Sequence, residues 1–153
     1  SYEFKHCTFN NNWASSKQVA VTVDNYYTDT TTNQQIAFDL IKADFKNCII
    51  FGSNQIELLV NKSTDTSKQF NKLFSKCQIK FNNTNNQFND TSEIIKNGIV
   101  DFQDISKNKL FIGADSASKN FGVDVGVPFD ILENPRNGIF DLGAYNSIIF
   151  PAD

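Results

Sequence analysis

The chain has 153 residues and a mass of 17.3 kDa, the size of a single domain that buries one hydrophobic core. Its 14 basic and 17 acidic side chains give a net charge of -3 at pH 7 without a cluster of Lys or Arg, which excludes nucleic acid as the default partner. Because no stretch approaches the roughly 20 apolar residues that cross a bilayer, we also expect no membrane-spanning segment.

Residues that favour strands dominate the composition. The 15 Ile, 8 Val and 10 Thr are β-branched, and they outnumber the 8 Ala and 7 Leu that favour helices. Asn is also abundant, with 20 residues, and it is the non-glycine residue that best tolerates a left-handed backbone. The composition therefore predicts an all-β fold with many tight bends.

Three segments share one pattern, in which an aromatic residue is followed by Cys three positions later and by an apolar residue two positions after that. The odd step breaks the alternation of a strand and the even step restores it, so a one-residue bend is predicted between two short strands. A left-handed backbone at the bend lets all three apolar side chains point to one interior. The bend residues are His6, Asn47 and Lys76, within FKHCTF (4–9), FKNCII (45–50) and FSKCQI (74–79).

The first two copies continue alike, with a polar turn and then a further strand at residues 19–23 or 56–60. The repeating unit is strand, bend, strand, turn, strand, and successive units are predicted to stack as coils. The copies are spaced more widely than one minimal coil requires, and the polar residues 26–35 and 61–69 are predicted to be the two extra surface loops. An antiparallel sandwich is the alternative, but it does not explain why the same phase break recurs around each Cys.

The C-terminal part of the chain lacks this repeat. Residues 99–102 and 110–112 predict short strands, and residues 122–145 hold most of the Gly and Pro residues. A stack of open coils exposes unpaired backbone and an apolar interior at its ends. We therefore expect the C-terminal part to close the stack.

These residues resemble the last coils of the right-handed parallel β-helix proteins secreted by Bacteroidetes-type bacteria, which belong to the pectate-lyase-like superfamily. The resemblance rests on FKNCIIFG (45–52), on the copy at 74–79, and on two C-terminal stretches. Those stretches, PFDILENPRNG (128–138) and DLGAY (141–145), match the family's usual ending, D-I-x-x-N-x-R-x-G followed by D-[IL]-G-A-Y. The chain departs from the family at Asn146, where Glu is common, and at 116–122, where S-P-A-I-D-x-G is usual.

The resemblance implies a right-handed parallel β-helix, a solenoid of about three or four coils with an irregular C-terminal cap. Coils with the two inserted loops are expected at residues 1–92, and the last coil with the cap at 93–153. Family members are several hundred residues long and this chain begins in mid-repeat, so we expect it to be the C-terminal part of a longer chain. Upstream coils or another protein chain would then cover the open N-terminal rung.

The same resemblance places the protein outside the cytoplasm, secreted or at the cell surface, with an outer-membrane anchor in the missing N-terminal part as one form. It also makes polysaccharide the expected partner. No cofactor is expected for this segment.

The three cysteines occupy equivalent positions of successive copies. Spacings this long fit no zinc pattern, the chain has one His, and it contains no Cys-x-x-Cys. We therefore interpret Cys7, Cys48 and Cys77 as small apolar residues of the interior rather than as metal ligands or nucleophiles. No metal site is predicted.

The β-helix lyases and hydrolases use Asp or Glu, in some cases with calcium and a Lys or Arg base, and such a site needs charged groups that converge on one outward strand face. By alternation, the outward positions of the clear coils are Lys5, Thr8, Lys46, Ile49, Ser75 and Gln78, which form no acidic cluster. We therefore predict no catalytic residue here. Catalytic groups of a longer enzyme would lie upstream or enter from Asp24, Asp29 or Asp65.

Other residues are assigned to structure or to ligand binding. Arg136, flanked by Asp130 and Asp141, is expected to tie the terminal loop together through charge-assisted hydrogen bonds, and an anionic-sugar contact is the alternative. Tyr145 of the family ending and Asn47 at the bend are also structural. Ligand-binding candidates are the aromatic residues in or beside predicted loops, which would otherwise pack the loops onto the coils: Trp13, Tyr26 and Tyr27.

Two functions follow from this reading. The leading one is a noncatalytic structural or carbohydrate-binding segment of an extracytoplasmic, cell-surface β-helix protein. The alternative is the C-terminal end of a polysaccharide lyase or glycoside hydrolase with its catalytic residues upstream. Fold alone does not choose between them.

Overall fold

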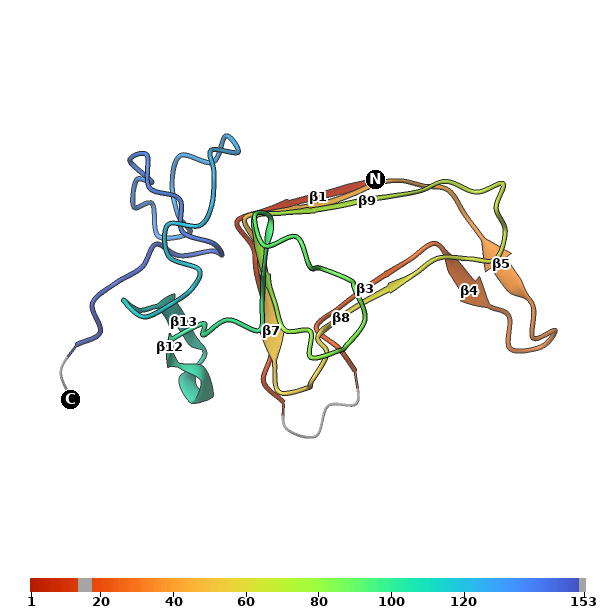
Figure 1. Ribbon diagram of the computed structural model, residues 1–153, viewed down its shortest axis with the longest axis horizontal. Coiled ribbons are helices and arrows are strands. Elements are labelled where there is room, and N and C mark those ends of the chain that lie inside the picture. Colours follow the sequence, from red (N-terminus) through yellow and green to blue (C-terminus); the bar gives the residue numbers. More distant parts are fainter. Residues whose placement is uncertain (14–17, 152–153) are drawn as a thin grey trace.

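The computed structural model describes residues 1–13 and 18–151. This part of the chain forms thirteen strands and one 3-10 helix of three residues, which confirms the predicted all-β class (Figure 1). The strands are three to seven residues long. Strands from successive repeats pair with one another, and this stacking decides where the candidate functional residues lie.

The first strands of the three repeats form one parallel sheet. It contains β1 (Tyr2–Lys5), β6 (Leu40–Lys46) and β9 (Phe70–Ser75), in the order β1-β6-β9. Phe4 is in register with Phe45, and Phe45 with Phe74. Their rings stack at centroid distances of 4.8 Å and 4.9 Å, so the predicted inward aromatic column is confirmed.

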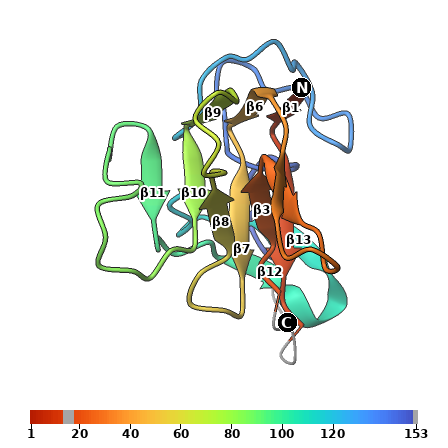
Figure 2. The ribbon, with the colours of Figure 1, turned by 90° about the vertical axis from the view of Figure 1, so that its right-hand side faces the viewer.

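The second strands of the repeats form a parallel sheet of their own. Its strands are β2 (Thr8–Asn11), β7 (Ile49–Gly52), β10 (Cys77–Ile79) and β11 (Ile94–Lys96), in the order β11-β10-β7-β2. Figure 2 shows β11, β10 and β7 side by side. Phe9, Ile50 and Ile79 align across neighbouring strands. Parallel pairing in both sheets rules out the antiparallel sandwich for the repeats.

A third, two-stranded parallel sheet forms the last side of the interior. It pairs β3 (Val21–Asp24) with β8 (Leu58–Asn61). Figure 1 shows the three sheets as the sides of an open frame, with the pairs β1/β9 and β3/β8 each superposed. The main core fills this frame, and its fully buried members include Cys48, Ile50, Leu58, Cys77 and Ile79.

The bends between the first and second sheets have the predicted backbone. The φ angles of His6, Asn47 and Lys76 are 50°, 54° and 51°, in the left-handed region. Asn adopts this conformation at low cost, whereas a residue such as Lys adopts it only where the surrounding structure holds it. Backbone bonds of the sheet provide that restraint, since the His6 amide donates to the Lys46 carbonyl at 2.9 Å and the Asn47 amide to Ser75 at 3.0 Å.

One predicted loop is instead a hairpin. Residues 26–35 were expected to be irregular, but β4 (Tyr26–Thr28) pairs antiparallel with β5 (Gln35–Ala37). Tyr and Thr favour strands, and Asp29 begins the turn by accepting from the amide of Thr31 at 2.8 Å. Residues 62–69, in the second predicted loop, contain no strand.

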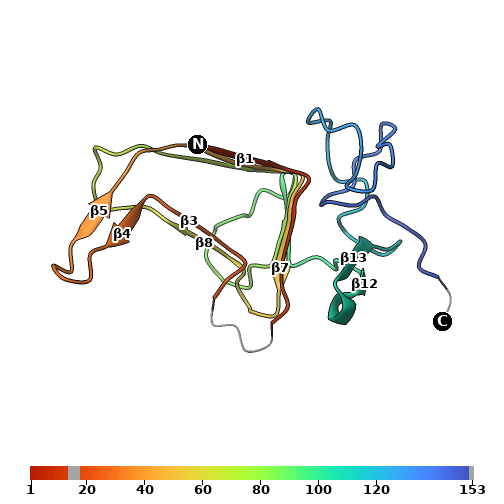
Figure 3. The same cartoon turned by 180° about the vertical axis from the view of Figure 1, so that it is seen from behind.

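The C-terminal part does not close the end of the stack as expected. It contains β12 (Phe102–Asp104), the helix η1 (Ile105–Lys107) and β13 (Lys109–Ile112), followed by irregular chain. Figures 1 and 3 show this part beside β7, outside the frame of sheets. Its contacts with the outer face of the second sheet include a hydrogen bond from the Ala144 amide to Thr8 Oγ1 at 3.0 Å.

This arrangement creates a second core on the outside of the stack. Ile49 points outward from β7, as predicted, yet it is fully buried against Val100, Ile112 and Leu142. Gln78 is buried on the same face, where its side chain bonds the carbonyl of Gly98 at 2.7 Å. Strand alternation gives the direction of a side chain, but it does not show whether another segment covers that face.

Replacing Ile49 should therefore destabilise the protein although it lies outside the main core. Ile49→Ala should lower the free energy of unfolding by about 3 kcal/mol, because it leaves a cavity between the second sheet and the C-terminal part. Chemical denaturation measures the change. Ile41→Ala, at an exposed position of β6, is the control and should change it by less than about 0.5 kcal/mol. Equal, small effects of the two substitutions would contradict the second core.

Candidate functional site

Exposed aromatic side chains gather where the hairpin β4–β5 meets the beginning of the first sheet. Tyr2, Tyr27 and Phe38 are 61%, 54% and 53% exposed, which is unusual for three large rings in one place. The rings of Tyr27 and Phe38 stack at a centroid distance of 5.9 Å. With Tyr26 and neighbouring polar residues they line a depression of about 320 Å³, here called the aromatic depression.

A buried asparagine holds the hairpin in place behind this depression. The backbone of Asn25 accepts from the Phe38 amide at 2.8 Å, and its side-chain Nδ2 donates to the Phe38 carbonyl at 3.1 Å. Asn25 Oδ1 accepts from the amide of Ser63 at 2.7 Å. The hairpin is thereby bonded to the segment that follows β8, which fixes the position of its aromatic rings.

Two carboxylates lie at the rim of the aromatic depression. Asp24 Oδ1 accepts from Asn61 Nδ2 at 2.8 Å, and Asp39 Oδ1 accepts from the backbone amide of Gln69 at 2.8 Å. Both carboxylates are thus oriented by residues that lie between β7 and β9 in the chain. They supply acceptors beside the aromatic rings, which is the combination that binding sites for small polar ligands use.

The predicted ligand-binding residues do not form one site. Tyr26 and Tyr27 belong to the aromatic depression, but Trp13 lines another depression with Asn10, Asn12 and Ile105. The two depressions share no lining residue. Phe38 and Tyr2 were missed, because the hairpin and the position of the first sheet bring them to Tyr27 from outside the predicted loop.

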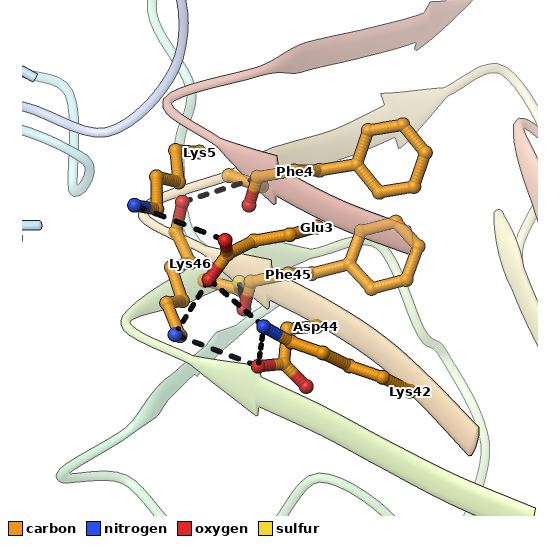
Figure 4. Close-up of polar contacts among 9 residues, drawn as sticks. Glu3, Phe4, Lys5, Lys42, Asp44, Phe45 and Lys46 are labelled. Carbon is orange, nitrogen blue, oxygen red and sulfur yellow. Dashed lines mark hydrogen bonds and ion pairs between the residues drawn. The ribbon is translucent and has the colours of Figure 1, made fainter. Parts of the chain in front are cut away.

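Figure 4 shows a second candidate, a cluster of charged side chains on the outward face of β1 and β6. Glu3 Oε1 lies 2.9 Å from Lys46 Nζ and 3.4 Å from Lys42 Nζ. Asp44 Oδ2 lies 3.5 Å from each of the same two amines. Lys5 approaches Glu3 at 3.9 Å, and these five residues are called the charged cluster.

The charged cluster is not arranged for proton transfer. Hydrogen bonding to Lys46 lowers the pKa of Glu3, and hydrogen bonding to Glu3 raises the pKa of Lys46. Glu3 and Lys46 are therefore held in their charged forms, whereas a general base or acid needs a pKa near the working pH. The outward residues next to the Cys motif include only Lys5 and Lys46 of this cluster, so no local pattern in the sequence predicts it.

Two acidic residues considered as catalytic candidates are engaged in turns. A hydrogen bond from the Thr31 amide lowers the pKa of Asp29, and a hydrogen bond from the Ser67 hydroxyl lowers the pKa of Asp65. Asp65 Oδ1 accepts from that hydroxyl at 2.6 Å. Both stay ionised at neutral pH and shape their own turns, so neither is placed as a proton donor.

The cysteines form a column in the main core. All three are free thiols, and the sulfurs of Cys48 and Cys77 lie 3.6 Å and 3.3 Å from the carbonyl oxygens of Phe4 and Phe45 in the preceding coil. Contact with the Cys48 thiol, then burial, raises the pKa of Cys7 far above its usual value. Contact with Cys7 lowers the pKa of Cys48, but the Cys77 thiol and burial outweigh it and raise the value to about 12.

The cysteines should therefore be unreactive in the folded protein. The thiolate is the nucleophile, and it is scarce in Cys48, whose pKa is raised, while Cys77 is fully buried and inaccessible to a reagent. Iodoacetamide at about pH 8 should leave Cys48 and Cys77 unmodified in the native state and label all cysteines after denaturation, as read by intact mass. Rapid native labelling of Cys48 or Cys77 would contradict the column, and the denatured sample is the control for reagent activity.

Arg136 is buried and ties the terminal loop together, but it does so through different partners from those expected. Its Nη1 donates to the Asp141 carbonyl at 3.2 Å and to Asn146 Oδ1 at 3.1 Å, and its Nη2 donates to the Gly143 carbonyl at 3.0 Å. The carboxylates instead accept from amides, as Asp130 does from the Asn146 amide at 3.0 Å. Burial lowers the pKa of Arg136, and the charges of Asp130 and Asp141 offset part of this.

Tyr145 joins two parts of the C-terminal region. Its ring packs against Phe111 of β13 with the centroids 4.4 Å apart. Nearby, the amide of Ile148 donates to the carbonyl of Ile112 at 2.9 Å. The position of Tyr145 is therefore that of a packing residue.

The side chain of Asn47 connects the bend to the C-terminal part. Its Nδ2 donates to the Val123 carbonyl at 2.6 Å, and its Oδ1 accepts from the Val123 amide at 3.2 Å. The Asn47 carbonyl accepts from the Gly143 amide at 2.8 Å. Asn47 thus combines a left-handed backbone with a side chain that pairs with the backbone of Val123.

His6 is buried at the same junction. Its Nδ1 lies 3.1 Å from the Asp141 carbonyl oxygen, and its Nε2 lies 2.9 Å from Asn47 Nδ2. A carbonyl only accepts and an amide nitrogen only donates, so we assign the proton of the neutral ring to Nδ1. Burial, with the nearby positive charge of Arg136, lowers the pKa of His6 to about 4.

His6 should make the protein less stable as the pH falls from 6.5 to about 4. A histidine with a lowered pKa in the folded state takes up a proton on unfolding, so its contribution is complete above the unfolded pKa and is lost on acidification. The loss amounts to about 3 kcal/mol. Chemical denaturation across this pH range measures it.

His6→Asn is the matched variant, because Asn suits the left-handed backbone and does not titrate. Carboxylates titrate in both proteins, so the difference in unfolding free energy between them isolates His6. The free energy of unfolding of the wild type should fall more steeply toward acid pH than that of the His6→Asn protein. A constant difference would contradict the assignment of a neutral, buried His6.

Comparison of the chain with family models, curated proteins and solved structures finds no match. Within the described residues, no group of three or more His, Cys, Asp and Glu side chains could hold a metal ion. In residues 1–13 and 18–151, no helix has the length and apolar character needed to cross a membrane. The possible functions are therefore weighed on the chemistry of the aromatic depression and the charged cluster.

Proposed function

We propose that this chain is a noncatalytic, carbohydrate-binding segment of an extracytoplasmic β-helix protein displayed at the cell surface. The in-register parallel pairing of successive repeats supports a parallel β-helix with one strand, bend, strand, turn, strand unit per coil. The right-handed sense is the one that parallel crossover connections adopt. The proposed location at the cell surface rests on the resemblance of the repeats and of the C-terminal stretches to secreted bacterial β-helix proteins.

The aromatic depression is the observation that carries the binding function. Sugar rings present an apolar face of C–H groups, which packs on an exposed aromatic ring, and hydroxyl groups, which bond acceptors at its rim. Tyr27 and Phe38 offer such a surface, and Asp24 and Asp39 offer the acceptors. Because the hairpin is bonded to the next coil through Asn25, little ordering entropy is lost on binding.

The charge of the depression favours a neutral glycan. Both ionisable side chains that accept hydrogen bonds at its rim are carboxylates, and neither Lys nor Arg is among the residues that line it. A uronic-acid polymer would meet like charge there and in the net charge of -3. We therefore assign the site to neutral polysaccharides.

The alternative, the end of a polysaccharide lyase or glycoside hydrolase, gains no support from the charged cluster. A lyase base must give up its proton near neutral pH, whereas the bond to Glu3 raises the pKa of Lys46. The hydrogen bond with Lys46 lowers the pKa of Glu3, so this carboxyl is not a protonated acid at neutral pH. The noncatalytic function is preferred on these grounds.

Removing the Tyr27 ring should weaken binding to a neutral polysaccharide about tenfold, because one stacking surface is lost. Isothermal titration of the protein with neutral and uronic-acid oligosaccharides measures the affinity. Phe129→Ala, which removes another half-exposed ring in the C-terminal part, is the control and should leave the affinity unchanged.

Three results would separate the possibilities. Equal loss in the Tyr27→Ala and Phe129→Ala proteins, or no affinity for any neutral glycan, would overturn the proposal. Binding that is lost only in Trp13→Ala would move the site to the other depression. Preference for uronic-acid oligosaccharides would overturn the assignment to neutral glycans.

A further inference from the structure

The chain contains one reactive dipeptide twice, in nearly identical sequence surroundings. KNGI (96–99) and RNGI (136–139) each place a basic residue, Asn, Gly and Ile in the same order. Asn followed by Gly is prone to deamidation, because Gly has no side chain to hinder attack of its amide nitrogen on the Asn side chain. Asn97 and Asn137 are both exposed. Neither the local sequence nor the exposure of the two residues therefore distinguishes them.

The fold restrains Asn97 strongly. Its Oδ1 accepts from the Phe81 amide at 2.7 Å, and its Nδ2 donates to the Phe81 carbonyl at 3.1 Å. The Asn97 amide donates to the Ile79 carbonyl at 3.0 Å, and its φ angle of 61° lies in the left-handed region. A Cβ added to Gly98 would lie 2.5 Å from the side chain of Ile95, so the chain is closely packed there. Attack on the Asn97 side chain must first break its two bonds to Phe81.

Asn137 has none of these restraints. Among the described residues, neither its side chain nor the amide of Gly138 has a hydrogen-bond partner. The Ile139 amide donates to the Arg136 carbonyl at 3.1 Å. Gly138 has a φ angle of 75° and Asn137 a negative one, so the two form the centre of a type II turn. A Cβ added to Gly138 would meet no atom within 4 Å, which shows that the turn stands free of other segments.

The peptide group between Asn137 and Gly138 can therefore change its orientation. Type I and type II turns differ mainly in the direction of this central peptide group, and both keep the outer hydrogen bond. Gly adopts the φ angle of either turn at low cost. Each change of orientation moves the Gly138 nitrogen relative to the Asn137 side chain. The corresponding peptide group after Asn97 has no such freedom, because packing and the bonds to Phe81 hold it.

We propose that Asn137 is a site of spontaneous deamidation in the folded protein and that Asn97 is protected from the same reaction. The Gly138 nitrogen forms a bond to Asn137 Cγ, and the side-chain NH2 leaves as ammonia, taking the proton of the Gly138 amide. The five-membered succinimide that results adds one water, and one of its two C–N bonds breaks. Cleavage at Cγ gives an aspartyl residue. Cleavage at the backbone carbonyl gives an isoaspartyl residue, in which the main chain runs through the side chain.

Either product changes the surface beside Arg136. Arg136, Asn137 and Gly138 line a depression of about 450 Å³ together with Asp124. The reaction adds a carboxylate there and makes the net charge one unit more negative than -3. The isoaspartyl form also lengthens the main chain directly after Arg136, whose amide donates to the Pro128 carbonyl at 2.8 Å. The modified protein is therefore separable from the unmodified chain by anion exchange.

Peptide mapping by mass spectrometry tests the proposal on the whole chain, incubated at physiological temperature in a mildly alkaline buffer. Deamidation at Asn137 should be at least about tenfold faster than at Asn97, because the two side-chain hydrogen bonds of Asn97 must break before attack. The isoaspartyl form should be found at position 137 beside the aspartyl form, since the succinimide gives both. The fraction of the more acidic species on anion exchange should rise at the same rate.

Two controls separate the effect of the fold from that of the local sequence. In a denaturant the two sites should react at nearly equal rates, because their neighbours along the chain are alike. Asn137→Gln keeps the side-chain amide but forms the larger cyclic imide far more slowly, so this variant should lose the more acidic species.

Several results would overturn the proposal. Equal rates at Asn97 and Asn137 in the folded protein exclude protection by the bonds to Phe81. A folded chain that stays unmodified at Asn137, while the denatured chain reacts at both sites, shows that the turn prevents the attack. An aspartyl product without the isoaspartyl form excludes the succinimide. An acidic species that persists in Asn137→Gln places the modification elsewhere.

Discussion

The left-handed bend at His6, Asn47 and Lys76 is the constraint on which this structure depends. A strand alternates its side chains between two faces, so an odd step from Phe to Cys would send the two side chains to opposite faces of a straight strand. One left-handed residue turns the chain and restores the apolar side chains to a single interior. The three φ angles agree within a few degrees, and the aromatic rings next to the bends stack. Because each repeat has the bend at the same place, the strands on both sides of it pair in register.

The bend column also holds the C-terminal part of the protein. A left-handed residue between two sheets lies at a corner, where its side chain and carbonyl are accessible to a segment outside the stack. Asn47 uses both, pairing with Val123 and accepting from Gly143, and His6 bonds the Asp141 carbonyl from the coil above. These bonds position the segment that covers Ile49 and forms the second core. Asn47 therefore has two roles: it adopts the left-handed backbone of the bend, and its side chain bonds the C-terminal part. Gly could adopt the same backbone, but it has no side chain to form these bonds.

The sequence was informative where one local rule decides the outcome and less so where distant segments meet. The aromatic column, the bends at 6, 47 and 76 and the buried cysteines all follow from strand alternation within six residues. The burial of Ile49 does not, because alternation says nothing of what covers an outward face. Tyr2, Tyr27 and Phe38 belong to different strands and turns, so no local pattern joins them. Lys42 and Glu3 meet only because β1 and β6 are neighbours in a parallel sheet, and that pairing places like charges beside each other along a column and opposite charges on the diagonal.

The hairpin β4–β5 adds a candidate binding surface without changing the pairing of the parallel sheets. It leaves the first coil after β3 and returns before β6, so its length does not change the register of either sheet. What fixes its direction is Asn25, whose side chain bonds the Phe38 carbonyl and the Ser63 amide in the following coil. An exposed aromatic pair on a hairpin without such a bond would lose orientational entropy whenever it bound a ring. Residues 61–69, which follow the second repeat, therefore help to shape the aromatic depression, and the stability of that repeat becomes a condition for the geometry of the site.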